Sequence, residues 1–264
     1  MDMTIVAEIR QRLAGIAVSH NVTIPLAIES GSRAWGFPSP DSDYDCRFIF
    51  VRSRAETFTL FPSRDVIEMP LTKVFDVSGW ELSKALRLML KGNAVVVEWL
   101  TSPFAYYRDE AFRDAFLALA ERTCDRRLIG RHYYHLAANQ LDRLQIDQVT
   151  IPLKKLFYSL RPLMALKWLD ENPQASMAPM HFPVLCAGVE LSVSVRQDID
   201  ELMARKAETR EMGDGPIPPS IRAFLSTEFE AARSWRDGEV AERPEIQPDI
   251  NVFWREWTDR MAPA

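Results

Sequence analysis

Two observations predict an α+β fold with a mixed first half and an all-helical second half. Short apolar runs bounded by glycine, proline and acidic residues, which are typical of strands, occur before Tyr106. From Tyr106 onward, apolar residues recur almost throughout at helical spacing. With 264 residues, 47% of them hydrophobic, the chain can bury a full core. We therefore expect a mixed domain over residues 1–104, a helical domain over 105–264, and a site in the cleft between them.

The first elements are a helix and two strands that flank a loop. Apolar residues at helical spacing predict the helix over residues 4–19. The apolar run 24–29 suits a strand, and the chain resumes as a second strand over 45–51. The loop between the strands carries the residues that interrupt regular structure, namely Gly31, Gly36, Pro38 and Pro40.

A third strand and one or two helices complete the first half. Residues 71–77 favour a strand. The tetrapeptide Ser-Gly-Trp-Glu at 78–81 fits the S-x-x-E capping box, so we expect a helix to begin there and to stop at Gly92. The next run, 95–100, is either a short strand or another helix.

Helical periodicity dominates the second half, and one proline-rich loop interrupts it. The expected helices span 112–122, 127–146, 153–169, 199–208 and 221–233. Residues 213–219 read as a flexible loop. The tail beyond Gly238 contains Phe253, Trp254 and Trp257, so we expect it to pack back onto the fold.

Composition argues against several classes of protein. No apolar run approaches the roughly 20 residues that cross a bilayer, and the first residues lack the basic start of a signal peptide. Three widely spaced cysteines form no zinc pattern and are expected to be buried, reduced thiols. We therefore expect a cytoplasmic protein without a membrane partner. The sequence leaves its oligomeric state open.

Charge is unevenly distributed along the chain. The net charge of -5 argues against a basic surface for duplex DNA. Between Arg122 and Lys167, however, nine Lys and Arg face three Asp, which is a local surplus of six positive charges.

The loop and the second strand bring two carboxylates together. Asp43 and Asp45 lie two residues apart, and residues i and i+2 of a strand share a face. Such carboxylates repel each other unless a cation or a proton lies between them. Mg²⁺ is bound through one or two carboxylates plus substrate phosphates, so this pair predicts a magnesium site. Asp41, in Pro-Asp-Ser, is typical of a turn, and Glu29 ends the first strand.

Gly31 and Ser32 follow the first strand directly. They offer a backbone free of side-chain bulk, two N–H donors and a hydroxyl, which together suit a phosphate group. Taken alone, each motif is most often an ordinary turn or loop. The spacing G-S-x(10)-D-x-D between two strands is much more specific.

This spacing resembles the signature of the polymerase-β-like nucleotidyltransferase superfamily. Three blocks resemble, more narrowly, its bacterial and phage branch associated with RNA repair: GSRAWGFPSPDSDYDCRFIFV, DVSGWELSKALRLMLKGNAVVVEWLTSP and KKLFYSLRPLMALKWL. The resemblance covers roughly residues 25–210. It implies a polymerase-β-like catalytic domain with a short mixed sheet, followed by a helical substrate-binding domain.

The resemblance also implies site residues. Gly31, Ser32 and Arg33 would bind the nucleotide, while Asp43 and Asp45 would bind catalytic Mg²⁺, with Mn²⁺ as an alternative. A third carboxylate is expected on a neighbouring strand. Asp76 is our choice for this catalytic and metal-binding position. The competitors are Glu98, which lies in an apolar segment, and Glu81, which the capping box explains better.

The helix expected over 153–169 has a basic and aromatic face. Lys154, Tyr158 and Arg161 lie at i, i+4 and i+7 and therefore share it. A solvated charged face is the ordinary explanation of such a stripe. Because Lys154, Lys155, Tyr158 and Arg161 match the branch's pattern, we expect these four residues to bind the nucleotide, the cations on phosphates and the tyrosine on a base.

Four other residues are not assigned to the nucleotide site. His132 and His135 are three apart on a helix, but no companion motif for zinc appears, so we interpret them as core or RNA-contacting residues. Trp35 is expected to pack rather than to stack on a base. Lys206 matches a branch position, but the sequence suggests no role for it.

The function expected from these residues is Mg²⁺-dependent transfer of a nucleotide from an NTP to an acceptor hydroxyl, with release of pyrophosphate. RNA, in a tRNA or repair context, is the expected acceptor. Two alternatives stay open: a small-molecule or protein acceptor, and a non-catalytic module that binds nucleotide or RNA. The choice of NTP and any use of a template are not predicted.

Overall fold

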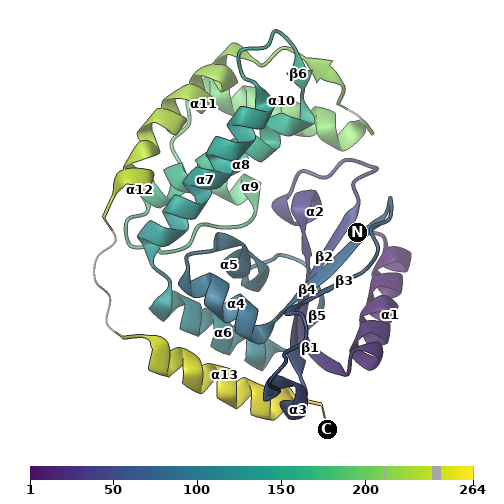
Figure 1. Ribbon diagram of the computed structural model, residues 1–264. Coiled ribbons are helices and arrows are strands. Elements are labelled where there is room, and N and C mark those ends of the chain that lie inside the picture. The colour runs from purple at the N-terminus through teal and green to yellow at the C-terminus, as the bar shows by residue number, and fades with distance from the viewer. Residues whose placement is uncertain (211, 240–244, 264) are drawn as a thin grey trace.

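The computed structural model describes residues 1–210, 212–239 and 245–263, and it confirms the α+β class. Its first half contains a five-stranded sheet in the order β3-β4-β2-β1-β5 (Figure 1). Strands β2 and β4 are parallel, whereas the other neighbouring strands are antiparallel. The strands are β1 (Val22–Ser30), β2 (Tyr44–Arg52), β3 (Val66–Glu68), β4 (Phe75–Glu81) and β5 (Ala105–Arg108).

Helices cover both faces of this sheet because its central strands are apolar on both sides. On β2, Phe48 and Phe50 pack towards α1 (Met3–Ser19), while Ile49 and Val51 pack into the cluster on the opposite face. The helices on that opposite face are α4 (Leu82–Leu90), α5 (Ala94–Leu100), α6 (Glu110–Thr123) and α13 (Gln247–Met261). The same alternation assigns Asp45 and Arg47 to the face of Ile49.

A second apolar core lies in the helical half. Its elements are α7 (Arg126–Leu144), α8 (Lys154–Glu171), α9 (Phe182–Ala187), α10 (Val193–Glu208), α11 (Pro219–Ala231), α12 (Arg233–Asp237) and a β6–β7 pair, Ile151–Pro152 with Asp214–Gly215. Phe37, Ala94 and Val97 of the first half join this core. The two halves are therefore packed against each other (Figure 1).

Most expected helices are confirmed, whereas the third strand spans different residues from those expected. The strand expected over 71–77 is β4, Phe75–Glu81, and the short β3 was not anticipated. No capping box forms: Ser78 pairs with Arg47 of β2, and Glu81 precedes α4 without a side-chain cap. Pairing with a parallel neighbour satisfies the backbone of 78–81 and overrides the local capping signal.

Five further segments can be compared with the expectations. The run 95–100 is helical, within α5. Part of the expected loop 213–219 forms β7, and the helix expected over 221–233 ends at Ala231, where α12 follows. The tail does pack back, as α13 against α4 and α6. Strand β5 lies beyond residue 104 and still belongs to the sheet. None of the described helices is both long and apolar enough to span a bilayer.

Candidate functional site

The Gly-Ser loop begins where β1 ends. Gly31 opens the short helix α2 (Gly31–Trp35) with a φ of +63°, which disfavours any residue with a side chain. A Cβ at this position would lie 2.0 Å from Oδ2 of Asp45. Gly31 therefore lets the loop approach the carboxylate of the neighbouring strand.

A cavity of about 370 Å³ lies between the two halves and gathers several of the expected residues. Ser32 and Asp43 contribute from the first half, and Lys154 and Tyr158 contribute from α8. The other lining residues are Ser39, Asp41, Ser42, Lys73, Pro152, Lys206, Arg210, Met212, Gly213 and Asp214. The Ser32 hydroxyl is held 3.0 Å from the Ser42 hydroxyl at this wall.

Of the three expected carboxylates, Asp43 lines this cavity, while Asp45 and Asp76 lie on adjacent strands and are not among its lining residues. Asp45 and Asp76 are register partners on the parallel strands β2 and β4, so both project from one face. Arg47, two residues beyond Asp45, lies between them: its guanidinium is 2.7 Å from Asp76 and 3.4 Å from Asp45. The i, i+2 rule that pairs Asp43 with Asp45 also places Arg47 on their face, although Arg47 was not among the expected site residues.

Burial and repulsion act together on Asp45. Burial, followed by the charge of Asp43, raises the pKa of Asp45 to about 6, and Asp76 adds to this while Arg47 opposes it. A cation between these carboxylates would relieve the repulsion. Carboxylate and hydroxyl oxygens at one wall are also the donors that Mg²⁺ prefers, so the residues fit such an ion.

Glu29 is buried directly behind the Asp45 backbone, near the end of β1. The backbone N–H of Asp45 donates to Glu29 over 3.2 Å, and the Tyr106 hydroxyl donates to the other carboxyl oxygen. Burial is the largest cause that raises the pKa of Glu29 to about 7. Glu29 thus holds the backbone at the start of β2 through its hydrogen bond with Asp45.

None of the three candidates for the third carboxylate, Asp76, Glu98 and Glu81, belongs to a metal-binding group among the described residues. Within residues 1–210, 212–239 and 245–263, no three His, Cys, Asp or Glu side chains are grouped closely enough to hold a metal ion, zinc at His132 included. Asp76 is engaged by Arg47. Glu98 is buried in α5, where it forms an ion pair with Arg161 and accepts from the Tyr133 hydroxyl over 2.8 Å. Glu81 faces Arg52 at 3.7 Å.

The α8 stripe divides into two parts. Lys154 and Tyr158 line the cavity, and burial, followed by the charges of Asp45 and Asp43, raises the pKa of Tyr158. Lys155 is exposed and does not line the cavity. Arg161 is buried: it pairs with Glu98, and its guanidinium lies 4.4 Å from the Trp35 ring centroid. A buried, paired arginine is not available to a phosphate.

Residues around the Gly-Ser loop hold it in place. Arg33 donates to the carbonyls of Ser42 and Asp43, at 2.5 and 3.0 Å, and lies over the Tyr44 ring. Arg33 thus braces the loop and does not line the cavity. Trp35 packs between Arg161 and Tyr158, whose ring is nearly perpendicular to it, and this agrees with a packing role.

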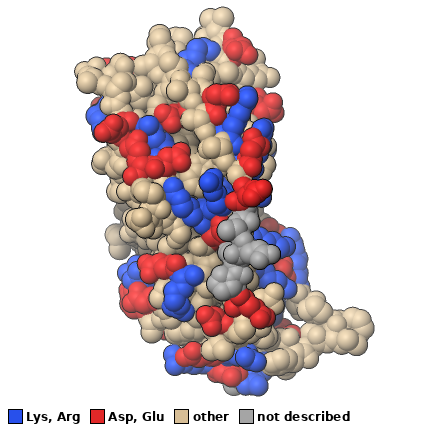
Figure 2. Space-filling model, turned by 90° about the vertical axis from the view of Figure 1, so that its left-hand side faces the viewer, with Lys and Arg blue, Asp and Glu red and all other residues tan. Residues whose placement is uncertain are grey.

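The surplus of positive charge does not form a continuous patch. Arg126 donates to carbonyls at the end of α8, Arg131 donates to the Gly238 carbonyl, and Lys167 pairs with two glutamates. On the face shown in Figure 2, acidic and basic side chains alternate. Of the nine basic residues, Lys154 is the one that lines the cavity.

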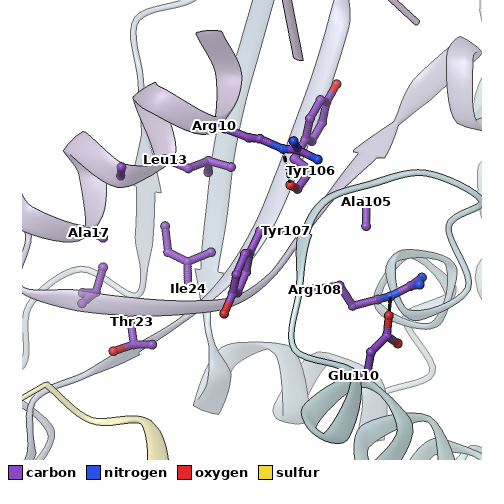
Figure 3. Close-up of a pocket in the computed structure, with 12 residues that line it drawn as sticks. Arg10, Leu13, Ala17, Thr23, Ile24, Ala105, Tyr106, Tyr107, Arg108 and Glu110 are labelled. Carbon is purple, nitrogen blue, oxygen red and sulfur yellow. Dashed lines mark hydrogen bonds and ion pairs between the residues drawn. The ribbon is translucent and has the colours of Figure 1, made fainter. Parts of the chain in front are cut away.

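A second, larger cavity has a different character. It is a groove of about 820 Å³ between α1, β1 and β5, and it is mostly apolar (Figure 3). Its arginines are engaged: Arg10 donates to the Tyr106 carbonyl over 2.8 Å, and Arg108 pairs with Glu110. None of the expected site residues lines this groove.

The comparison with protein families agrees with the resemblance. The model of a family described as the RNA repair pathway DNA polymerase beta family (RlaP) matches residues 5–256. The uncharacterized protein YcgL of Bacillus subtilis (strain 168) is 35% identical over 252 residues, which cover 95% of this chain and 94% of that protein. A crystal structure of a nucleotidyltransferase-like protein from Exiguobacterium sibiricum 255-15 covers 96% of this chain and 91% of its own at 11% identity, with a TM-score of 0.32. The chain belongs to the RNA repair pathway DNA polymerase beta family.

Proposed function

We propose that this protein is a cytoplasmic nucleotidyltransferase that transfers a nucleotide from an NTP to an acceptor hydroxyl and releases pyrophosphate. One observation carries the proposal: Ser32 and Asp43 line the same cavity as Lys154 and Tyr158 of the helical half. Hydroxyl, carboxylate, ammonium and phenol groups there meet the needs of a phosphate chain, a metal ion and a base.

Mg²⁺, or Mn²⁺ in its place, would be held by Asp43 and Asp45. Such an ion would supply neutralisation of developing charge and activation of the acceptor hydroxyl. Burial is the largest cause of the raised pKa of Asp45, and the charge of Asp43 is the next; the repulsion from Asp43 supports this assignment, because a closely placed carboxylate pair favours a bound cation. Asp76 is the proposed third ligand, and Arg47 would have to release its side chain for that role.

The other residues would bind and orient the NTP. The backbone at Gly31 and the Ser32 hydroxyl would donate to phosphate oxygens, and Lys154 would neutralise their charge from the opposite wall. Tyr158 would stack on the base. In the reaction, the acceptor oxygen forms a bond to the α-phosphorus, and the bond from that phosphorus to the bridging oxygen breaks, so that pyrophosphate leaves.

We propose RNA as the acceptor, with support from the description of the family. A specific observation favours a second candidate, a small molecule or protein. Most basic residues of the 122–167 segment have contacts within the fold, so they offer little charge to a long phosphate backbone.

The test is nucleotide transfer by purified protein. Wild type is incubated with each α-³²P-labelled NTP, Mg²⁺ and total RNA, beside Asp43→Asn/Asp45→Asn and a matched surface control, Asp249→Asn. We expect labelled RNA with wild type and the control, and a loss of at least about 10³-fold in the double variant, because the metal ligands are gone.

The outcomes separate the candidate functions. Label on a small molecule or on protein would retain the chemistry and reject RNA as acceptor. Binding of NTP without any transfer would favour the non-catalytic module. Undiminished labelling by the double variant would reject the assignment of the metal ligands.

A further inference from the structure

Lys206 is a buried lysine that forms no ion pair with any described residue. It lies in the last turn of α10 and is 5% exposed. Its ammonium nitrogen is 4.6 Å from the ring centroid of Phe37 and 5.3 Å from that of Phe157. Among the described residues, no carboxylate forms an ion pair with it. The two rings hold the ammonium at the wall of the cavity between the halves.

Burying a charged ammonium group costs free energy unless an anionic partner compensates for the lost hydration. Desolvation, followed by the charge of Lys154, lowers the pKa of Lys206 to about 8, and Asp41 partly opposes this. The charged side chains that line the cavity with Lys206 are Lys73, Lys154, Arg210, Asp41, Asp43 and Asp214. Because Lys154 and Arg210 are also basic, a compact anion in the cavity would lower the repulsion between them and Lys206.

We propose that Lys206 is a polyphosphate-binding residue whose ammonium contacts the phosphate chain of the ligand bound between the halves. The identity of that ligand as an NTP rests on the function proposed above. The polyphosphate class rests on the cavity: about 370 Å³ holds a compact ligand, and its wall carries four basic side chains against three carboxylates, together with three serine hydroxyls. α10 would thus add a third element to a site otherwise built from the Gly-Ser loop and α8.

The first measurement is binding of inorganic tripolyphosphate without divalent metal, by isothermal titration calorimetry at pH 7. Lys206→Met keeps the apolar stem between the two rings and removes the charge. Lys91→Met, at an exposed position outside the cavity, is the matched control. We expect Lys206→Met to raise the Kd about 10- to 100-fold, the range for losing one hydrogen bond to a charged group, and the control to match wild type.

A second measurement reports the proton on Lys206. With its pKa lowered to about 8, Lys206 titrates near pH 8 in the empty protein, and a bound polyanion favours the charged form. Wild type should therefore take up more protons per ligand bound at pH 8 than Lys206→Met, measured in buffers of different ionisation enthalpy. Protons exchanged by the ligand itself cancel in this difference.

Stability distinguishes binding from a structural role. A buried ammonium that serves to bind a ligand destabilises the folded protein when no ligand is bound. Lys206→Met should therefore have an equal or higher Tm than wild type at pH 7. A lower Tm together with weaker binding would indicate a packing role and would overturn the proposal. So would equal tripolyphosphate affinity in wild type and Lys206→Met, or no binding by wild type.

The results are separable from those on transfer. Binding of tripolyphosphate that depends on Lys206, without any nucleotide transfer, would support this inference and reject the transferase. Transfer by wild type, with unchanged tripolyphosphate affinity in Lys206→Met, would support the transferase and reject the role of Lys206 in polyphosphate binding.

Discussion

Glu29 shows how a single buried carboxyl can support a site without facing it. It accepts hydrogen bonds from the Asp45 N–H and the Tyr106 hydroxyl and is fully buried. Its pKa of about 7 lies above the ordinary value of 4.5. The folded chain therefore binds more protons than the unfolded chain between about pH 4.5 and 7, and the free energy of unfolding must fall as pH rises through this window.

Glu29→Gln should remove most of this pH dependence. The amide can accept from Asp45 and donate to Tyr106, and it does not titrate. In urea denaturation with EDTA, wild type should lose on the order of 3 kcal/mol between pH 5 and pH 8, to which Asp45 adds with the same sign. Glu121→Gln, at an exposed site, should behave as wild type. Equal slopes in wild type and Glu29→Gln would contradict the assignment.

At the same scale, the sequence predicts local geometry better than distant partners. The i, i+2 rule brings Asp43 and Asp45 together, and the lack of a side chain at Gly31 has its reason in the approach of Asp45. The helical face shared by Lys154 and Arg161 is equally local, yet Arg161 turns out to be engaged by Glu98 of α5. Periodicity along one helix carries no information about which element covers its far end.

At the scale of elements, α13 shows that the tail is structural. Trp257 is buried and meets the Phe112 ring edge-on, with centroids 5.2 Å apart, so α13 closes the face of the sheet that carries α4 and α6. Its aromatic residues were enough to predict docking. The sequence could not indicate which surface they would cover, because that surface exists only after the sheet has formed.

Trp257→Ala should therefore destabilise the whole first half. Removal of a buried indole costs about 3–5 kcal/mol. Val252→Ala, on the exposed side of the same helix, should change the free energy of unfolding by less than about 0.5 kcal/mol. Urea denaturation measures both. A loss below 1 kcal/mol for Trp257→Ala would mean that α13 does not contribute to the core.

The difference between the expected and the observed third strand also arises from contacts that form only in the folded sheet. Ser78 and Glu81 match a capping box, but the same residues pair with β2 as the parallel strand β4. Local signals for capping are worth about 1 kcal/mol, and a full ladder between two buried strands outweighs them. The same pairing places Asp76 in register with Asp45.

At the scale of the molecule, aromatic and charged contacts join the two halves beside the cavity. Phe37, from the loop before β2, stacks on Phe157 of α8 with centroids 4.8 Å apart. Arg161 of α8 connects Trp35 of α2 with Glu98 of α5. Because these contacts fix α8 against the Gly-Ser loop, Lys154 and Tyr158 face Ser32 and Asp43 across one cavity.

The most direct test of this account is a crystal structure with Mg²⁺ and a non-hydrolysable NTP analogue. We predict that the phosphate chain lies between Ser32 and Lys154, and that Asp43 and Asp45 bind the ion at about 2.1 Å. Asp76 at that distance would identify it as the third ligand. An analogue bound instead in the groove between α1 and β5, or an ion that contacts neither Asp43 nor Asp45, would contradict the account.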